Sequence, residues 1–281
     1  MNHGAADAPA ARIAAVKYNA VTSRDNPLYK RLKALATSTQ ARKKEGLSIL
    51  DGAHLVQAAI DRWGAPEIVA VSEAAMARPE IARLAAAAGP GVVHFPATLF
   101  ESLSTVGHGA GIVAAVRTPR TALPSIIAGD CLLLEHLQDP GNMGSLLRSA
   151  QAAGVVQVFC SPRTVYAWSP KVLRAGQGAH FGLTIVEGVD LAEVIARLAV
   201  PLAATALRGA ASVYDTDLTQ PLAWLFGNEG AGVSEDLLAR ADHRVCIPMP
   251  GACESLNVAA AGAVCLFEQV RQRSRRAGSG A

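Results

Sequence analysis

Apolar residues along this chain form two successive alternations of short strands and helices. In the first, Leu28, Leu32 and Leu35 recur at helical spacing and predict a helix that begins at Asn26. Further apolar runs follow, with helical stretches between some of them. We expect strands at LSIL, EIVAVS, GVVHF and GIVAAV, and helices over 54–62 and 74–88. The first alternation therefore predicts a small α/β unit that ends near Val116.

The second alternation follows a segment that contains Pro119 and Pro124 and has no sustained periodicity. Its apolar runs are continuous, which is typical of strands in a mostly parallel sheet that helices cover on both faces. We expect strands at CLLLEHL, VVQVFC, PLAATAL, LAWLFG and RVCIPM, and helices over 145–153, 170–176, 191–199, 234–241 and 257–273. The pattern predicts domains over 21–116 and 130–273, a linker over 117–129, and tails over 1–20 and 274–281.

The composition indicates a globular chain. Of the 281 residues, 51% are hydrophobic and 17% are charged, which supplies a sizeable core. No apolar run reaches the roughly 18 residues of a membrane span, and the N-terminus lacks the basic and apolar regions of a secretory signal. We therefore expect a cytoplasmic protein with no membrane partner. The five Cys are widely spaced and the seven His lack ligand spacing, so we expect neither disulfides nor a metal site.

The small positive net charge is unevenly distributed. Residues 1–120 carry 14 Lys and Arg against 9 Asp and Glu, whereas residues 121–281 carry 12 against 14. The excess is concentrated in 24–44, where seven cations stand against Asp25 alone. Clustered cations attract a polyanion such as RNA, although a solvated helix face explains the same pattern. The cations expected to bind RNA phosphates here are Arg24, Lys30, Arg31, Lys33, Arg42, Lys43 and Lys44.

Three loops that follow expected strands are rich in Gly, Asn, Glu and Ser. QDPGNMGSLLRSAQAAG follows CLLLEHL, GNEGAGVS follows LAWLF, and PGACESLNVAAAGAV follows RVCIPM. In doubly wound sheets, ligands bind outside the carboxyl ends of the strands. Each loop alone is also explained by a turn and a helix cap. Neither a Rossmann G-x-G-x-x-G nor a P-loop motif occurs at a strand-to-helix junction, so a different kind of pocket is predicted.

Together, NMGSLLRSAQAAG, LFGNEGAGVS and IPMPGACESLNVAAAGA resemble the three signature motifs of the SpoU (TrmH) family of RNA 2′-O-ribose methyltransferases, within the SPOUT superfamily. They occur in the family's order and spacing across 132–270. SPKVLRAGQGAHF is similar to the family's segment between the first two motifs. The basic helix and LSILDGAHLVQAAI resemble a small substrate-binding domain related to ribosomal protein L30e. Asp51 stands where Glu is usual, and Gly176 where Ser is common.

The resemblance implies an α/β fold in which a small L30e-like domain precedes a SPOUT domain, a parallel sheet with helices on both faces and a deep trefoil knot. S-adenosylmethionine would bind in the knot, held by Gly227, Ile247 and Leu256, with Thr205 a weaker candidate. This suits the sequence, because Gly and Pro loops let a backbone approach the adenosine closely.

The resemblance also implies the catalytic residues. The family's proposed general base corresponds to Arg148; because a guanidinium stays protonated near neutrality, we expect it to act chiefly as an electrostatic clamp on the 2′-oxygen and adjacent phosphate. Asn142 would orient the ribose or Arg148, and Glu229 would hold Asn142 or the partner loop. Ser255 and Asn257 would bind the substrate phosphate and brace the cofactor loop. Each of these residues except Arg148 could instead serve as a helix cap or helix-terminal charge.

The function expected from the resemblance is S-adenosylmethionine-dependent 2′-O-methylation of RNA, with 23S ribosomal RNA preferred because of the accessory domain. Lys171 and Arg174 would flank the pocket and contact the RNA, and the last helix would form a homodimer. Three alternatives stay open: a tRNA 2′-O-methyltransferase, a non-catalytic RNA-binding or ribosome-assembly protein, and a generic nucleotide-binding α/β enzyme.

Overall fold

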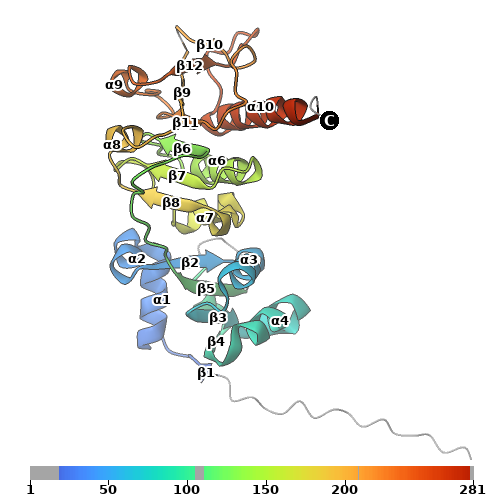
Figure 1. Cartoon of the computed structure of the whole chain (residues 1–281). Coiled ribbons are helices and arrows are strands. Elements are labelled where there is room, and N and C mark those ends of the chain that lie inside the picture. The colour runs from blue at the N-terminus through green and yellow to red at the C-terminus, as the bar shows by residue number, and fades with distance from the viewer. Residues whose placement is uncertain (1–18, 105–110, 208, 279–281) are drawn as a thin grey trace, which may run out of the picture.

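The computed structural model describes residues 19–104, 111–207 and 209–278, in two halves that each contain one sheet (Figure 1). Residues 1–18 of the predicted N-terminal tail and 279–281 of the C-terminal tail lie outside this part of the chain. The N-terminal half runs from residue 19 to 117 and the C-terminal half from 131 to 278. The expected α/β class is confirmed for both halves.

The N-terminal half is a five-stranded mixed sheet in the order β1-β4-β3-β5-β2. Strands β1, β3 and β4 are parallel, and β5 is antiparallel to both β3 and β2. Its strands are β1 (Asn19–Ala20), β2 (Leu47–Asp51), β3 (Ile68–Ser72), β4 (Val92–Phe95) and β5 (Ile112–Arg117). Its helices are α1 (Pro27–Thr37), α2 (Thr39–Glu45), α3 (Ala53–Trp63), α4 (Pro79–Ala88) and α5 (Ala97–Phe100), with 3₁₀ turns η1 (Glu73–Ala77) and η2 (Gly89–Gly91).

The basic helix predicted from Asn26 onward is two helices, because Ser38 interrupts it. The Asn26 side chain accepts a hydrogen bond from the Leu28 N–H and Pro27 takes the first helical position, so α1 begins where predicted. The Ser38 N–H donates to Ala34 O and ends α1, while its hydroxyl accepts from the Ala41 N–H and begins α2. The basic residues therefore lie on two helix axes.

The C-terminal half is a seven-stranded sheet in the order β10-β12-β9-β11-β6-β7-β8, with every pair parallel. Its strands are β6 (Cys131–Leu134), β7 (Gln157–Cys160), β8 (Thr184–Glu187), β9 (Leu202–Thr205), β10 (Ala211–Ser212), β11 (Ala223–Phe226) and β12 (His243–Cys246). Its helices are α6 (Pro140–Ala152), α7 (Pro170–Gly176), α8 (Leu191–Ile195), α9 (Glu235–Leu238) and α10 (Val258–Gly278), with the 3₁₀ turn η3 (Ala179–Gly182). Figure 1 shows α6, α7 and α10 on one face and α8 and α9 on the other.

The predicted parallel sheet is thus confirmed. The strands that the sequence analysis did not predict are β1, β8 and β10, which are short or have polar ends. Strand β8 has two polar ends, Thr184 and Glu187, and β1 and β10 have two residues each. Helix α6 begins five residues earlier than predicted, because Asp139 caps it and Pro140 takes the first position. The trefoil knot, the L30e relationship and the proposed domain bounds stay predictions.

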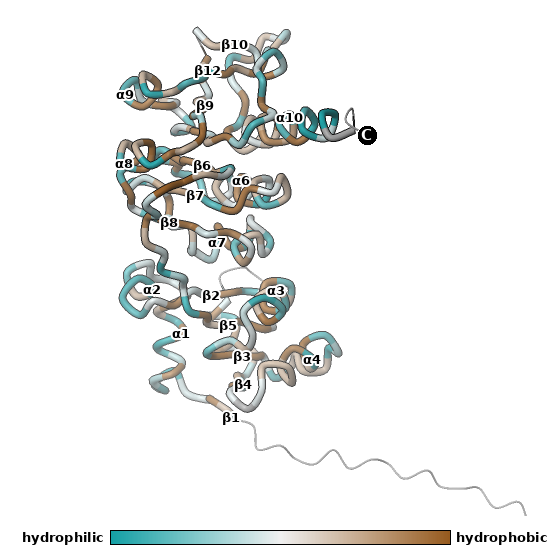
Figure 2. The backbone as a smooth tube through the Cα atoms, viewed as in Figure 1, coloured by the Kyte–Doolittle hydropathy of each residue, from teal (hydrophilic) through white to brown (hydrophobic). Residues whose placement is uncertain are grey.

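One apolar core extends across both halves. Leu50 and Val56 of the N-terminal half belong to the same buried cluster as Trp168 and Leu173. At the boundary, Trp63 packs edge-to-face on Phe181 with ring centroids 4.8 Å apart. Figure 2 shows hydrophobic segments along the strands of both halves and hydrophilic ones on the last turns of α10. The two sheets are therefore held together by apolar packing as well as by the connecting segment.

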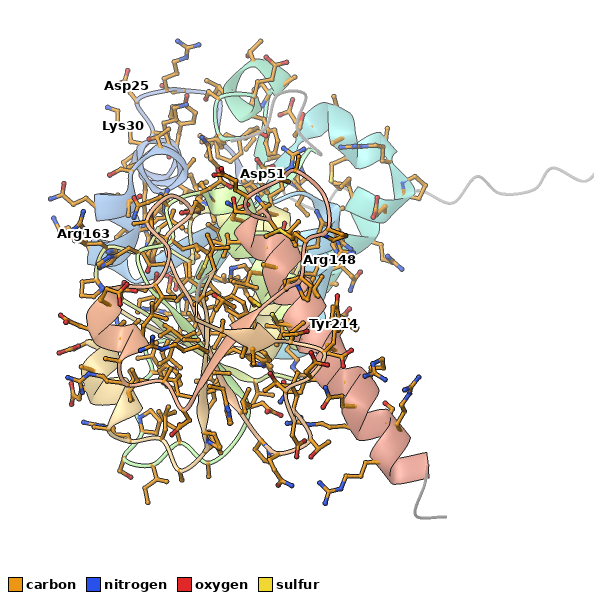
Figure 3. All side chains as sticks on the ribbon, turned by 90° about the horizontal axis from the view of Figure 1, so that it is seen from above. Asp25, Lys30, Asp51, Arg148, Arg163 and Tyr214 are labelled. Carbon is orange, nitrogen blue, oxygen red and sulfur yellow. The ribbon has the colours of Figure 1, made fainter. Side chains whose placement is uncertain are left out.

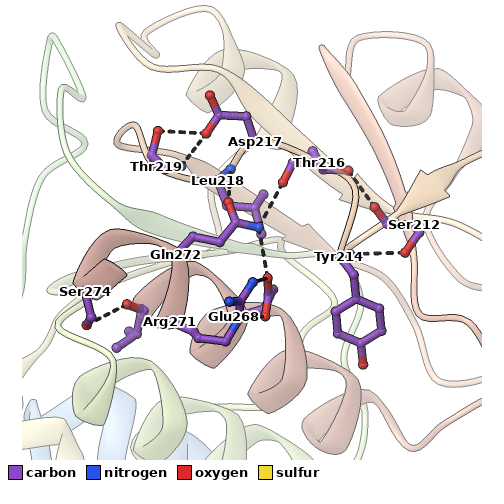
Figure 4. A network of polar contacts seen from close by, with 11 residues as sticks. Ser212, Tyr214, Thr216, Asp217, Leu218, Thr219, Glu268, Arg271, Gln272 and Ser274 are labelled. Atoms are coloured by element: carbon purple, nitrogen blue, oxygen red, sulfur yellow. Dashed lines mark hydrogen bonds and ion pairs between the residues drawn. The ribbon is translucent and has the colours of Figure 1, made fainter. Parts of the chain in front are cut away.

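Helix α10 packs on α6 near its start and is hydrogen-bonded to the loop between β10 and β11 farther along. Near its start, a Cβ on Gly262 would overlap the Leu146 side chain, so glycine lets α10 pack closely on α6. Farther along, Gln272 accepts a hydrogen bond from the Leu218 N–H at 2.9 Å and donates to Thr216 O at 3.0 Å (Figure 4). Glu268 accepts from both Gln272 and Arg271. No helix among the described residues is long and apolar enough to cross a bilayer.

Candidate active site

A cavity of about 790 Å³ lies at the carboxyl ends of β9, β11 and β12. All three Gly- and Asn-rich loops singled out in the sequence contribute to it: Asn142 from the first, 227–233 from the second, and 254–258 from the third. These segments are far apart in the chain, and the parallel sheet brings them to one edge, as expected for a doubly wound fold.

The carboxylate of Glu229 is the centre of a hydrogen-bond cluster at the mouth of this cavity. It accepts from the Asp139 N–H at 2.9 Å and from the Gln138 N–H at 3.1 Å. The Asn142 side-chain amide also donates to it, at 3.2 Å. Glu229 therefore ties the loop after β11 to the loop after β6. The sequence predicted that Glu229 holds Asn142 or the partner loop; the structure shows hydrogen bonds from Asn142 and from the loop after β6, and the role of Glu229 in the reaction stays a prediction.

Asn142 is held from two sides. Its amide donates to Glu229, and its Oδ1 accepts a hydrogen bond from the Asn257 amide at 2.7 Å. Asn257 in turn accepts from the Ala259 N–H at 2.9 Å and so caps the first turn of α10. Asn142 was also expected as a possible cap of its own helix; that prediction is wrong, because Asp139 is the cap and accepts from the Asn142 N–H at 2.7 Å.

These hydrogen bonds set the ionisation of Glu229. Partial burial alone would raise the pKa of Glu229, but the N–H groups of Asp139 and Gln138 and the Asn142 amide all favour the charged form and together hold the pKa below its ordinary value. Glu229 is thus an anion near neutral pH. Because an ionised carboxylate only accepts hydrogen bonds, it fixes Asn142 with the amide NH₂ toward Glu229 and the oxygen toward Asn257.

The residues proposed to hold a cofactor line the same cavity. Gly227, Ile247 and Leu256 all contribute, as does the weaker candidate Thr205. A Cβ on Gly227 would overlap the backbone carbonyl of Gly232, so only glycine lets the two loop segments meet here. Leu256 is 42% exposed and presents an apolar side chain at the rim. Backbone groups and apolar side chains therefore form most of the wall.

Sequence reasoning missed the residue that shapes the second loop, Asn228. Its side-chain oxygen accepts from the Gly230 and Ala231 N–H groups, each at 3.0 Å, and its amide donates to His136 O at 2.8 Å. An Asn that precedes a Gly-rich turn is a known signal for such side-chain-to-backbone bonding. Asn228 therefore holds the turn that carries Glu229.

Arg148 and Ser255 differ in their relation to the cavity. Ser255 is exposed and lines it. Arg148 is exposed on α6 but does not line the cavity; it follows Asn142 by six residues, or about 9 Å along the helix axis. Arg148 makes no hydrogen bond or ion pair with any residue that the structure describes. Figure 3 places Arg148 and Arg163 on opposite sides of the molecule. The guanidinium of Arg148 is thus free to meet a ligand.

The proposed RNA-binding cations fall into different environments, and Arg42 is a clear correction. Its side chain is buried, and its guanidinium donates to Leu35 O at 2.6 Å and to Thr39 Oγ1 at 2.8 Å. Arg42 therefore closes the end of α1 and is not available to RNA. Lys171 and Arg174 are exposed on α7 and neither lines the cavity, so their place beside the pocket stays a prediction.

The remaining cations are exposed or half-exposed, and several already have partners. Lys30 pairs with Asp25 at 2.9 Å, and the two lie side by side in Figure 3. Arg31 pairs with Glu45 at 2.6 Å, and Lys33 donates to Ser102 O. Those exposed without an ion pair to the described residues are Arg24, Lys43, Lys44, Lys171 and Arg174. The ammonium of Lys43 lies 5.1 Å from the ring centre of Tyr166.

Known proteins are similar to this chain in sequence and in fold. Residues 131–267 match the model of the SpoU rRNA Methylase family. The chain is 33% identical over 261 residues to an uncharacterized tRNA/rRNA methyltransferase of Synechocystis, covering 90% of this chain and 94% of that one. It is 30% identical over 250 residues to the 23S rRNA (guanosine(2553)-2′-O)-methyltransferase RlmP of Bacillus subtilis, covering 88% and 97%.

Solved structures of the same family have a similar fold. An AdoMet-bound rRNA methyltransferase from Sinorhizobium meliloti superposes with a TM-score of 0.78 at 26% identity, covering 90% of this chain and 97% of that one. The SpoU methyltransferase AviRb from Streptomyces viridochromogenes, in complex with AdoMet, gives 0.79 at 26% identity, covering 88% and 98%. With relatives at 30% identity or more along nearly their whole length, this chain belongs to the SpoU rRNA methylase family.

Proposed function

We propose that this chain transfers a methyl group from S-adenosylmethionine to a ribose 2′-hydroxyl of 23S ribosomal RNA. The observation that carries the proposal is the convergence of three distant loops on one cavity, with Glu229, Asn142 and Asn257 hydrogen-bonded in series at its mouth. Membership of the family and the activity named for the Bacillus subtilis relative support the reaction and the substrate. We place this activity in the cytoplasm, where the proposed substrate is found.

The cavity fits S-adenosylmethionine in size and in the chemistry of its wall. Its volume of about 790 Å³ is within the range of small-molecule sites. The close approach at Gly227 leaves backbone groups to face an adenosine, while Ile247 and Leu256 offer apolar contact. We assign Gly227, Ile247 and Leu256 to hold the cofactor, which supplies an electrophilic methyl group when bound. The two solved relatives that carry AdoMet support S-adenosylmethionine as the cofactor.

The chain's own residues would act by positioning and by electrostatic stabilisation. Attack by a 2′-oxygen requires that oxygen to be aligned and its developing negative charge to be stabilised. We assign Asn142 to orient the ribose, with Glu229 and Asn257 holding the amide in one orientation. Ser255, exposed at the rim, would bind the adjacent phosphate. Arg148 would supply a bidentate cation to the 2′-oxygen and phosphate once RNA is bound.

We further propose that the chain is a homodimer that buries the surface around α10. Three apolar side chains are exposed on or next to this helix: Phe267 at 48%, Leu256 at 42% and Tyr214 at 52%. Exposed large apolar side chains of this kind are typical of interaction sites, and we assign these three to the dimer surface. The hydrogen bonds from Gln272 to the loop that carries Tyr214 hold this surface in a fixed shape before association.

Two measurements test the proposed function. Calorimetry with S-adenosylmethionine should give saturable binding at one site per chain; absence of binding would remove the methyltransferase assignment. Mapping of 2′-O-methyl groups in total RNA from cells with and without the gene should show one 23S rRNA position that loses its methyl group. Loss of a methyl group at a tRNA position would show that the substrate is tRNA and would leave the proposed reaction standing. No change in any RNA would contradict both the proposed reaction and the proposed substrate.

A further inference from the structure

A second cavity, of about 340 Å³, lies where the two halves of the chain meet. Its floor is at the carboxyl ends of β7 and β8, where Ser161 and Glu187 line it. Lys43 of α2 and Arg120 of the connecting segment line it from the other side. We refer to it as the interface cavity. Both halves contribute polar groups to it, and none of these belongs to the active site described above.

One carboxylate oxygen of the interface cavity, Oε2 of Glu187, has no hydrogen-bond donor among the described residues. The half-buried Glu187 accepts a hydrogen bond through Oε1 from the Ala167 N–H at 2.7 Å. No residue that the structure describes donates to its Oε2. Burial raises the pKa of Glu187, which the Ala167 hydrogen bond and the nearby Lys43 charge partly oppose. Oε2 can therefore accept a charge-assisted hydrogen bond from an N–H donor that enters the cavity.

The opposite wall supplies cations and an aromatic ring. The Lys43 ammonium lies over the ring of Tyr166, 5.1 Å from its centre, and no carboxylate of the described residues is within ion-pair distance of it. Arg120 is exposed and likewise makes no ion pair with them. Next to the ring, the Ser48 and Thr118 hydroxyls lie 2.6 Å apart and both interact with Tyr166. The ring is thus fixed in place, with two available cations near it.

This cavity and the active site share one edge of the same sheet. Strands β8 and β11 are three strand spacings apart, or about 14 Å. The loops between them are bonded to each other, because the Gln138 side chain donates to Arg163 O at 2.5 Å while the Gln138 N–H donates to Glu229. An RNA strand with a ribose at Asn142 has to extend only about 14 Å along this edge to reach the interface cavity.

We propose that the interface cavity binds one further nucleotide of the substrate RNA, whose base carries an exocyclic amino group. The inference rests on the proposed function, since RNA is the ligand. The amino group donates to Oε2 of Glu187, in the way that carboxylates accept from the cytosine amine. The phosphate is bound by Lys43 and Arg120. A uracil base binds more weakly in this orientation, because its O4 carbonyl would face the carboxylate where cytosine places an amine.

The test uses 5′-CMP and 5′-UMP as probes, since their bases differ only at position 4, an amine against a carbonyl, and at the adjacent N3, an acceptor against an N–H. NMR titration of the full chain, saturated with S-adenosylhomocysteine so that the first cavity is filled, should give at least about tenfold tighter binding of CMP. Lys43→Ala should weaken CMP about tenfold, whereas Arg62→Ala, an exposed cation of α3 that lines neither cavity, should leave CMP affinity unchanged. Glu187→Gln should bring the two affinities together, because an amide can also donate to the uracil oxygen.

Equal binding of CMP and UMP by the wild-type chain would overturn the proposal, and this comparison requires no variant to fold. Unchanged CMP affinity in Lys43→Ala would overturn it as well. Both results are independent of the methyltransferase assignment, which fails only if S-adenosylhomocysteine and S-adenosylmethionine do not bind. If neither binds, the titration with CMP and UMP still reports on the interface cavity, because its residues are separate from those of the active site.

Discussion

The side-chain amide of Asn257 donates a 2.7 Å hydrogen bond to the Oδ1 of Asn142 and so links the start of α10 to the start of α6. Asn257 has two tasks, since its own oxygen accepts from the Ala259 N–H and caps α10. With Glu229 on the other side of Asn142, the orientation of one amide is fixed by residues from two different loops. The two tasks of Asn257 can be separated by substitution.

Asn257→Asp keeps an oxygen to cap α10 but removes the donor to Asn142. We expect kcat for RNA methylation to fall about 10²-fold, because a small misplacement of a positioning group has costs of this order. S-adenosylmethionine affinity and the melting temperature should stay close to wild type. Asn257→Ala removes the cap as well and should also destabilise the fold by about 1 kcal/mol. Wild-type kcat in Asn257→Asp would show that the Asn142 contact has no part in the reaction.

Gly227→Ala tests the cofactor cavity. A methyl group at this position overlaps the Gly232 carbonyl, so the loop must move and S-adenosylmethionine binding should be lost. Gly230→Ala is the matched control: Gly230 lines the same cavity, but its Cβ would meet only Asn228 Oδ1, at an ordinary 3.6 Å. Calorimetry should give near-wild-type affinity for Gly230→Ala. Equal losses in both variants would argue against a specific role for the Gly227 contact.

Arg148 is predicted to serve RNA and not the cofactor. Arg148→Ala should lower kcat/KM for RNA about 10²-fold and leave S-adenosylmethionine affinity unchanged, because Arg148 is exposed outside the cavity. Arg148→Lys should recover little of this, since an ammonium cannot form a bidentate contact. A pH–rate profile of Arg148→Lys tests whether position 148 acts as a bidentate clamp or as a base. Near-wild-type activity with an unshifted profile would exclude both a bidentate clamp and a base at this position.

The pH dependence of stability should contain a contribution from His180. Burial lowers the pKa of His180 to about 4, and its Nε2–H donates to Ala167 O. Between about pH 6.5 and 4 the unfolded chain binds a proton there that the folded chain does not. Stability from this group is therefore present above pH 6.5 and falls by about 3 kcal/mol as the pH drops to 4.

Denaturant unfolding at pH 7 and pH 4 measures this contribution. His180→Gln should lose less stability than wild type over that interval, by a difference near 3 kcal/mol, and equal losses would contradict the assignment. The same packing explains why glycine occupies position 176, where Ser was expected: a Cβ there would lie 2.7 Å from the His180 ring.

Phe267→Glu tests the proposed dimer surface. A charge at a buried apolar contact is costly, so light scattering during size-exclusion chromatography should show a shift from dimer to monomer. Val156→Glu is the control, because Val156 is similarly exposed, at 56%, but lies next to β7 and away from α10. A monomeric wild type would contradict the dimer proposal. Dimers in both variants would show that the interface does not include Phe267.

The elements best predicted from sequence are those whose signals are local. Helix α7 has the predicted bounds because Ser169 caps it and Pro170 starts it. The buried strands β6, β7 and β11 each lie within continuous apolar runs. The three site loops converge because parallel strands share a carboxyl edge, which follows from topology alone.

Other features depend on contacts between distant residues and could not be read from spacing. Arg42 was grouped with the surface cations by charge, but the turn at Ser38 folds its side chain back onto the carbonyls of α1. The interface cavity combines Lys43 and Glu187, which no motif connects. The charge pattern therefore located a basic region, but it could not show which of its side chains are exposed and which, like Arg42, are buried.

The most direct test is a reaction in vitro with the purified chain, S-adenosylmethionine and unmodified 23S rRNA, analysed by mass spectrometry of the nucleosides. The proposed function predicts one 2′-O-methylated nucleoside per rRNA, formed by wild type and by Gly230→Ala but not by Gly227→Ala. Methylation on a base, or none on any RNA despite bound cofactor, would contradict it.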